Sequence, residues 1–86
     1  MSIVPPSDYP ERVRLALDAL PGTDADRARA LGVDRSTILR WRTGEVAPSR
    51  PQALAEPLGV DVALLVYGPT ARLRVMLAAR AAEVGP

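Results

Sequence analysis

The sequence predicts an all-α fold, and three observations support this prediction. Apolar residues recur at the three- and four-residue spacing of amphipathic helices, and no segment alternates as a half-buried strand would. Helix-start signals, in which Ser, Thr or Asp precedes an acid or amide by three residues, open several of these segments. Glycine or a Pro-Gly pair then follows where each segment ends. We therefore expect a compact five-helix domain over residues 8–68 and an extra C-terminal helix within residues 69–86.

Composition limits the chemistry of the chain. It has 86 residues, of which 48% are hydrophobic, so a single small domain can bury a modest core. It contains no Cys and no His, which removes disulfides, thiolate metal sites and the usual general base. We therefore expect no enzymatic activity, no metal, no cofactor and no small-molecule ligand. Carboxylates such as Asp24 and Asp26 are explained by a helix start, where acids are favourable.

The sequence shows neither a membrane span nor a secretion signal. No apolar run approaches the roughly 20 residues that cross a bilayer, and residues 1–10 lack a basic and an apolar region. All basic residues are Arg, a bias typical of GC-rich genomes such as those of actinobacteria and their phages. We expect a soluble cytoplasmic protein of a bacterium or a phage-infected cell.

The first helix follows an aperiodic tail over residues 1–7. It can start near Asp8, with Pro10 in its first turn, and Pro21-Gly22 stands after its end. Its apolar positions at helical spacing are Val13, Ala16, Leu17 and Leu20.

A very short turn joins the second and third helices. Thr23 and Asp26 form a capping box that opens the second helix, whose expected inner face is Ala25, Ala28 and Leu31. Gly32 ends this helix and Asp34 caps the next, so about three residues connect them. Because glycine adopts positive φ without strain, such a turn folds two helices across each other as a helix-turn-helix.

Packing residues at fixed offsets agree with this motif. Ala28 is small, as the close passage of the next helix requires, and Ile38 and Trp41 supply the apolar groups that lock the pair. The third helix is expected to end near Gly44. An ordinary antiparallel helix pair would share part of this pattern.

The fourth helix carries one irregular position. Ser49 and Gln52 form a possible capping box at its start, and its inner stripe and end are Leu54, Leu58 and Gly59. Pro57 in its last turn removes an N–H and crowds the carbonyl of Ala53, so we expect a local distortion there.

Two further helices complete the chain. Asp61 opens a short fifth helix that runs through Leu64 and Leu65 to Gly68. The last helix, from about Thr70 to Val84, is strongly apolar.

Arginines cluster around the third helix, in "LGVDRSTILRWRTGEVAPSR" (residues 31–50). Between Arg35 and Arg50 four arginines face a single acid, Glu45, although the whole chain has a net charge of only +1. Arg and hydroxyl side chains on a helix read base edges and grip phosphates. A solvated helix with ordinary surface arginines is the alternative.

The stretch "LGVDRSTILRWRTGEVAPSRPQALAEPLGVDVALLVYG" resembles the Cro/lambda-repressor (XRE) type of helix-turn-helix domain. In that family a Leu-Gly-Val turn precedes the recognition helix and a Gly follows it. A Pro-Ser helix start, Leu-Ala-x-x-Leu-Gly-Val and Leu-Leu-x-x-Gly come next. All of these motifs are present in order, and the match covers about residues 10–68.

The resemblance implies that this protein binds double-stranded DNA, with the third helix in the major groove. It assigns base reading to Arg35, Ser36, Thr37 and Arg40, with a phosphate contact as the other role open to Thr37 and the two arginines. It assigns phosphate contacts to Thr23, Arg27, Arg42, Ser49 and Arg50, helped by the dipole at a helix start. The implied function is a sequence-specific transcriptional regulator, a small Cro-type repressor encoded by a phage.

Three positions depart from the family pattern. Asp24 stands where the family usually has a phosphate-binding Gln, so Thr23 or Arg27 would have to replace it. Arg42 stands where Glu is common, and Pro57 lies inside a helix.

The C-terminal helix is expected to form a homodimer that reads two half-sites about one helical turn apart. Its apolar stripe is Leu73, Met76, Leu77 and Val84, with the small Ala81 beside it. Val75 and Ala79 lie off this stripe, so the helix has more apolar surface than one contact needs. Part of the stripe must instead cover the protein's own first and fifth helices.

Two other functions compete with this interpretation. An excisionase or MerR-like DNA-architectural protein would follow the recognition helix with a β-hairpin wing. An antitoxin-like protein-interaction module would use the apolar C-terminal helix to cover a partner.

Overall fold

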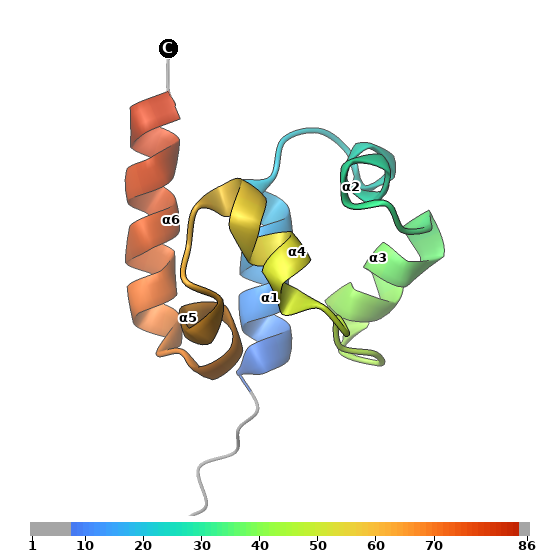
Figure 1. The fold of residues 1–86 in the computed structure, drawn as a ribbon, viewed down its shortest axis with the longest axis horizontal. Coiled ribbons are helices and arrows are strands. Elements are labelled where there is room, and N and C mark those ends of the chain that lie inside the picture. Colours follow the sequence, from blue (N-terminus) through green and yellow to red (C-terminus); the bar gives the residue numbers. More distant parts are fainter. Residues whose placement is uncertain (1–7, 85–86) are drawn as a thin grey trace, which may run out of the picture.

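The computed structural model describes residues 8–84, including the side chains of residues 8–83. Its α-helices are α1 Tyr9–Ala19, α2 Asp24–Leu31, α3 Arg35–Thr43, α4 Pro51–Ala55, α5 Val62–Tyr67 and α6 Thr70–Val84, with a 3-10 turn, η1 Glu56–Leu58, after α4 (Figure 1). Residues 8–84 contain no strand. The predicted all-α fold, five helices with a helix-turn-helix and one extra C-terminal helix, is confirmed. The tail predicted over residues 1–7 lies outside the described residues.

Local hydrogen bonds at the starts of α2 and α5 agree with the sequence. The Asp26 N–H donates to Thr23 Oγ1 at 3.2 Å, and the Thr23 N–H donates to Asp26 Oδ2 at 2.9 Å. This pair is the predicted capping box. At α5, Asp61 Oδ1 accepts from the Ala63 N–H at 2.9 Å.

The capping box predicted for α4 is wrong. Arg50, not Ser49, is the N-cap, and no side chain caps this helix. Pro51 occupies the first helical position, where its φ suits a helix and its missing N–H is not needed. The helix therefore begins too late for Ser49 to reach its first free N–H groups. Asp8 and Asp34 do occupy N-cap positions of α1 and α3, but neither makes a side-chain cap bond.

Pro57 distorts the chain as expected. The α-helical bonding of α4 ends at Ala55, and the next turn, Glu56–Leu58, is a 3-10 helix. A proline in this turn has no N–H for the α-helical bond, so the tighter turn completes the segment before Gly59.

Helix α1 lies at the centre of the fold, in contact with α3, α4, α5 and α6. Its predicted apolar face is buried: Val13, Ala16, Leu17 and Leu20. Leu54 and Leu58 cover it from α4 and η1, and Leu64 and Leu65 from α5. On α2, Ala28 is buried and Leu31 half-buried, but Ala25 is exposed and the prediction for it is wrong. The helix has only eight residues, and its first turn extends beyond the core.

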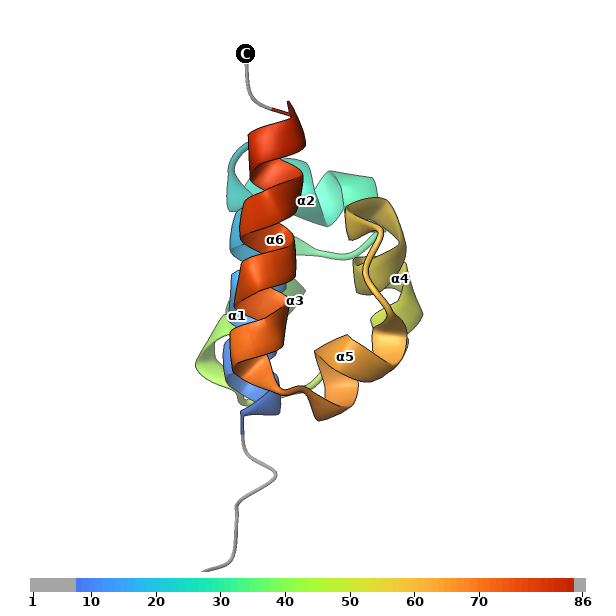
Figure 2. The ribbon, with the colours of Figure 1, turned by 90° about the vertical axis from the view of Figure 1, so that its left-hand side faces the viewer.

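The C-terminal helix α6 runs beside α1, as the two views of the ribbon agree (Figure 2). Leu73 and Leu77 are buried in the same core as α1 and α5. Met76 is 37% and Val75 is 67% exposed. Half of the expected stripe therefore covers the protein's own helices, and the side chain of Val84 lies outside the described residues.

One charged side chain, Arg12 of α1, is buried in this core at 4% exposure. Its Nε donates to the Leu65 carbonyl at 2.7 Å and its Nη2 to the Val66 carbonyl at 2.5 Å. Its Nη1 donates to Thr70 Oγ1 at 3.0 Å. Arg12 thus satisfies carbonyls at the end of α5, which lack partners within the helix, and joins them to the start of α6.

Candidate nucleic-acid interface

The turn between α2 and α3 has the predicted geometry. Gly32 has φ 73° and ψ 31°, and the Val33 N–H donates to the Ala28 carbonyl at 3.0 Å. Only residues 32–34 separate the two helices. Ala28 is 5% exposed, as expected where α3 passes closely over it. Figure 1 shows α2 almost end-on and α3 across it, the steep crossing of a helix-turn-helix.

Helix α3 presents one face to the core and the other to solvent. Ile38 is fully buried and Trp41 is 8% exposed, so both predicted anchors are in place. Arg35, Ser36 and Arg40 are exposed, and Thr37 is half-buried. Among the described residues neither Arg35 nor Arg40 has a hydrogen-bonding or ionic partner for its side chain. The helix is therefore held from behind while two guanidinium groups remain free in front.

Leu39 lies on the outer face of α3 but carries neither charge nor a hydroxyl group, so the sequence pattern of arginines and hydroxyls did not indicate it. It is 47% exposed, and at about 100° per residue it lies between Arg35 and Arg40 around the helix. Thr43, one turn later, is also exposed. Its spacing of four residues from Arg35 could have identified it, because residues three or four apart share a helix face.

Arg42, at the end of α3, lies in an ion-pair cluster. Its Nε and Nη2 donate to the two oxygens of Asp24 at 3.0 and 2.9 Å. Its Nη1 lies 2.9 Å from Asp18 Oδ1. The side chain of Arg42 is 24% exposed and that of Asp24 21%. The cluster joins α1, α2 and α3.

Arg27 belongs to the same cluster. Its Nη1 donates to Asp24 Oδ1 at 2.8 Å and its Nε to the Leu20 carbonyl at 3.1 Å. Hydrogen bonding from Arg42 lowers the pKa of Asp24, and Arg27 adds to the effect. In return, the hydrogen bond to Asp24 raises the pKa of Arg42. Asp24 and Arg42 therefore remain charged near neutral pH. Both predicted phosphate-binding arginines, Arg27 and Arg42, are engaged by groups of the protein itself.

The other three residues predicted to contact phosphate differ in whether the protein itself already binds their side chains. The Thr23 hydroxyl is used by the capping box, since its Oγ1 also lies 3.0 Å from Asp26 Oδ2. Its hydrogen bonds to that carboxylate lower the pKa of Asp26, so the start of α2 is negatively charged. Ser49 and Arg50 are exposed, and within residues 8–84 no protein group binds their side chains.

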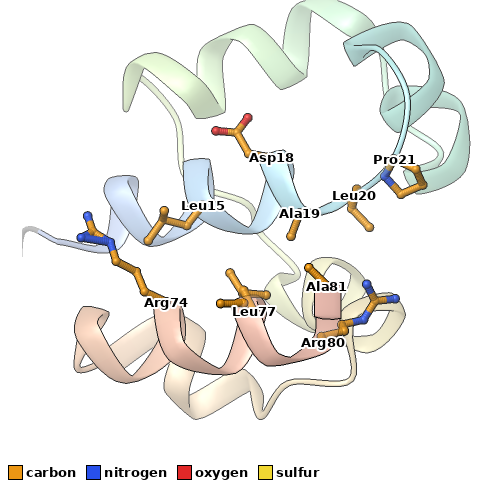
Figure 3. A pocket seen from close by; sticks show the side chains of 10 residues that line it. Leu15, Asp18, Ala19, Leu20, Pro21, Arg74, Leu77, Arg80 and Ala81 are labelled. Carbon is orange, nitrogen blue, oxygen red and sulfur yellow. The ribbon is translucent and has the colours of Figure 1, made fainter. Parts of the chain in front are cut away.

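A groove of about 600 Å³ separates α1 from the outer half of α6 (Figure 3). Leu15 and Ala19 of α1 and the following Leu20 line one side, and Leu77, Ala78 and Ala81 of α6 line the other. Asp18, Arg74 and Arg80 add charged groups to this lining.

Two further features are absent from the described part of the chain, a group of metal ligands and a membrane-crossing helix. No three His, Cys, Asp or Glu side chains in it are arranged to hold a metal ion. No helix among these residues has the length and apolar character to cross a membrane.

Comparison with known proteins gives one informative similarity. The chain is 43% identical over 63 residues to a protein of Haemophilus influenzae named as an uncharacterized HTH-type transcriptional regulator. The aligned part is 71% of this chain and 26% of that protein, so the chain spans about a quarter of its relative's length. No model of a known protein family matches the chain. No solved structure matches it either.

Proposed function

We propose that residues 8–68 are the DNA-binding domain of a transcriptional regulator, with α3 as the recognition helix in the major groove. One observation carries this proposal. Ile38 and Trp41 anchor α3, while Arg35 and Arg40 are exposed on its outer face and have no partner among residues 8–84. The similarity to a protein named as an HTH-type regulator supports it.

The outer face of α3 supplies the chemistry for reading bases. Arg35 and Arg40 can each donate two hydrogen bonds to guanine O6 and N7, so we expect guanine at two positions of the half-site. Ser36 and Thr37 offer hydroxyl groups to a base edge or a nearby phosphate. Ser49 and Arg50, which follow α3 and are exposed, are the proposed phosphate contacts.

We further propose that regulation is repression of the Cro type. A DNA-binding domain that occupies a site overlapping a promoter blocks transcription by excluding other proteins from that site. An excisionase-type protein would have a β-hairpin wing after the recognition helix. In this chain, residues 51–58 form α4 and η1 instead.

The test is selection of bound sites from random DNA, followed by binding measurements on the selected site. Arg40→Ala should weaken specific binding by about 1–3 kcal/mol and relax the preference at one base pair. Arg72→Ala is the matched control, because it removes the same charge from an exposed position on α6, across the molecule from α3 (Figure 1). An unchanged base preference in Arg40→Ala would make this residue a phosphate contact only. Failure of the wild type to retain any DNA at low salt would favour a protein-interaction module.

We also propose that a second copy of the chain docks on α6. Leu73 and Leu77 are used within the domain, but the groove beside α1 and the exposed Val75 leave apolar surface for a partner. Most of the groove is lined by Leu and Ala side chains of α1 and α6, so an apolar surface of a second copy could fill it. Two-fold symmetry would also double the number of bases read.

Ala81→Glu tests the dimer, because Ala81 is exposed and lines the groove. We expect sedimentation equilibrium at micromolar concentration to give a dimer for the wild type and a monomer for this variant. Ala63→Glu adds the same charge at an exposed position of α5 and should leave the dimer intact. A monomeric wild type that binds an asymmetric site one to one would disprove dimerisation.

A further inference from the structure

The guanidinium group of Arg42 is bound by two carboxylates of the protein. All three of its nitrogens contact carboxylate oxygens, two of them the paired oxygens of Asp24 and the third that of Asp18. A two-pronged arrangement of this kind fixes direction as well as distance. Asp18 belongs to α1 and Asp24 to α2, so one side chain of α3 is bound to both neighbouring helices.

The main chain of the same residue is held independently. Arg14 Nη1, from α1, donates to the Arg42 carbonyl at 2.9 Å. This carbonyl belongs to the last turn of α3, where the helix itself supplies no donor. Both the side chain and the backbone of Arg42 therefore connect the end of α3 to α1.

The ion pairs around Arg42 are balanced in charge, although the Arg14 guanidinium also lies against the Arg42 carbonyl. Arg27 and Arg42 contribute two cations, and Asp18 and Asp24 contribute two anions. A phosphate that approached Arg42 would have to displace a carboxylate from a bidentate pair and would be repelled by both acids. Phosphate contact is therefore disfavoured at this position.

We propose that Arg42 is a positioning residue, which fixes the orientation of the recognition helix on α1 and α2 and does not contact phosphate. This inference rests on the DNA-binding function proposed above. Base reading by Arg35 and Arg40 needs both side chains at hydrogen-bonding distance from fixed base edges. The cluster binds the C-terminal end of α3, and Ile38 and Trp41 anchor its middle. The helix therefore cannot rotate and carry Arg35 and Arg40 away from the base edges.

A charge-neutral double variant, Arg42→Met with Asp24→Asn, separates the two roles. It removes the bidentate pair but keeps the net charge of the cluster, so long-range attraction to DNA is unchanged. We expect the slope of log affinity against log salt to stay at the wild-type value. The ratio of specific to non-specific affinity should fall about tenfold. Arg50→Met, at a proposed phosphate contact, should lower the slope by about 0.9 and leave the ratio nearly unchanged.

The opposite pattern overturns the inference. If the double variant lost about 0.9 of salt slope and kept its specificity ratio, Arg42 would be a phosphate contact. Circular dichroism establishes that each variant is folded. If the double variant does not fold, Arg42→Lys replaces it, because Lys keeps the charge but cannot form the paired bonds. A wild-type ratio in Arg42→Lys would then contradict the positioning role. Absence of specific binding by the wild type would instead disprove the proposed function.

A second inference rests on a different observation, the exposed Leu39 between the two free arginines. An apolar side chain at 47% exposure on the outer face of the recognition helix matches the one apolar group of the major groove, the 5-methyl of thymine. We infer that Leu39 contacts a thymine methyl in the half-site, and this too depends on the proposed DNA binding.

Replacement of thymine by uracil tests this contact one methyl group at a time. At one thymine of the selected half-site, uracil should weaken wild-type binding about fourfold, the effect of one buried methyl group. In Leu39→Ala the same replacement should have no effect. Tyr67→Ala, at an exposed position at the end of α5, should behave as the wild type. If uracil has no effect at any position, or if its effect persists in Leu39→Ala, the inference is wrong. Neither result would affect the general assignment of DNA binding.

Discussion

Replacement of the buried Arg12 by Met should destabilise the fold without creating a large cavity. Met follows the path of the aliphatic stem of Arg but cannot donate a hydrogen bond. The carbonyls of Leu65 and Val66, which accept from Arg12 at 2.7 and 2.5 Å, would lose their partner. The Thr70 hydroxyl would lose a donor at 3.0 Å.

The expected loss of stability depends on which of these groups water can reach after Arg12 is replaced. Leu65 is completely buried, so its carbonyl would remain unpaired at a cost of about 1–3 kcal/mol. Val66 and Thr70 are half-buried, and water can reach them at a smaller cost. The guanidinium also loses hydration on burial in the wild type, which offsets part of its favourable contribution. We therefore expect Arg12→Met to lower the free energy of unfolding by about 2–4 kcal/mol, a large part of the roughly 4–13 kcal/mol typical of a chain of this length.

Urea denaturation followed by the fluorescence of Trp41 measures this change. Arg72→Met is the control, because Arg72 is exposed on α6 and its replacement should change stability by less than about 0.5 kcal/mol. If Arg12→Met unfolded within about 0.5 kcal/mol of the wild type, the helix-end carbonyls would not depend on Arg12, and its role as their cap would be refuted.

Three further predictions concern stability. Trp41→Ala should lower the free energy of unfolding by about 3–5 kcal/mol, because a buried aromatic anchor is lost. Urea denaturation followed by circular dichroism measures this change, and a midpoint near that of the wild type would contradict the prediction. Leu73→Ala should lower the free energy of unfolding by about 2–5 kcal/mol, because Leu73 is fully buried. Val75→Ala should lower it by less than about 0.5 kcal/mol, because Val75 is 67% exposed. Equal effects of the two variants on thermal unfolding would contradict the packing of α6. The lowered pKa of Asp24 means that its carboxylate stabilises the fold fully above the ordinary value of 3.8 and loses this effect as the pH falls through the lower folded-state value. The melting temperatures of wild type and Asp24→Asn should therefore differ at about pH 6 and converge below 3.8, and a difference independent of pH would exclude this linkage.

The sequence by itself determined the features that depend on residues close together in the chain. The capping box of Thr23 and Asp26 and the turn at Gly32 need only local geometry, and both agree with the prediction. The spacing of Ile38 and Trp41 likewise identified the buried face of α3. Local signals also misled at Ser49, because the following Pro51 decided where α4 begins.

Only the tertiary structure decided what each arginine does. All basic side chains of this sequence are Arg, so residue type could not separate an arginine exposed on α3 from one that is bound by other groups of the protein. Arg12 is buried because residues 53 and 54 positions away bring their carbonyls to it. Arg42 is paired because α1 and α2 fold back beside the end of α3, whereas no acid of the described chain approaches Arg40. Partners so distant in sequence leave no periodic signal along the chain, and they become visible only when the helices are packed.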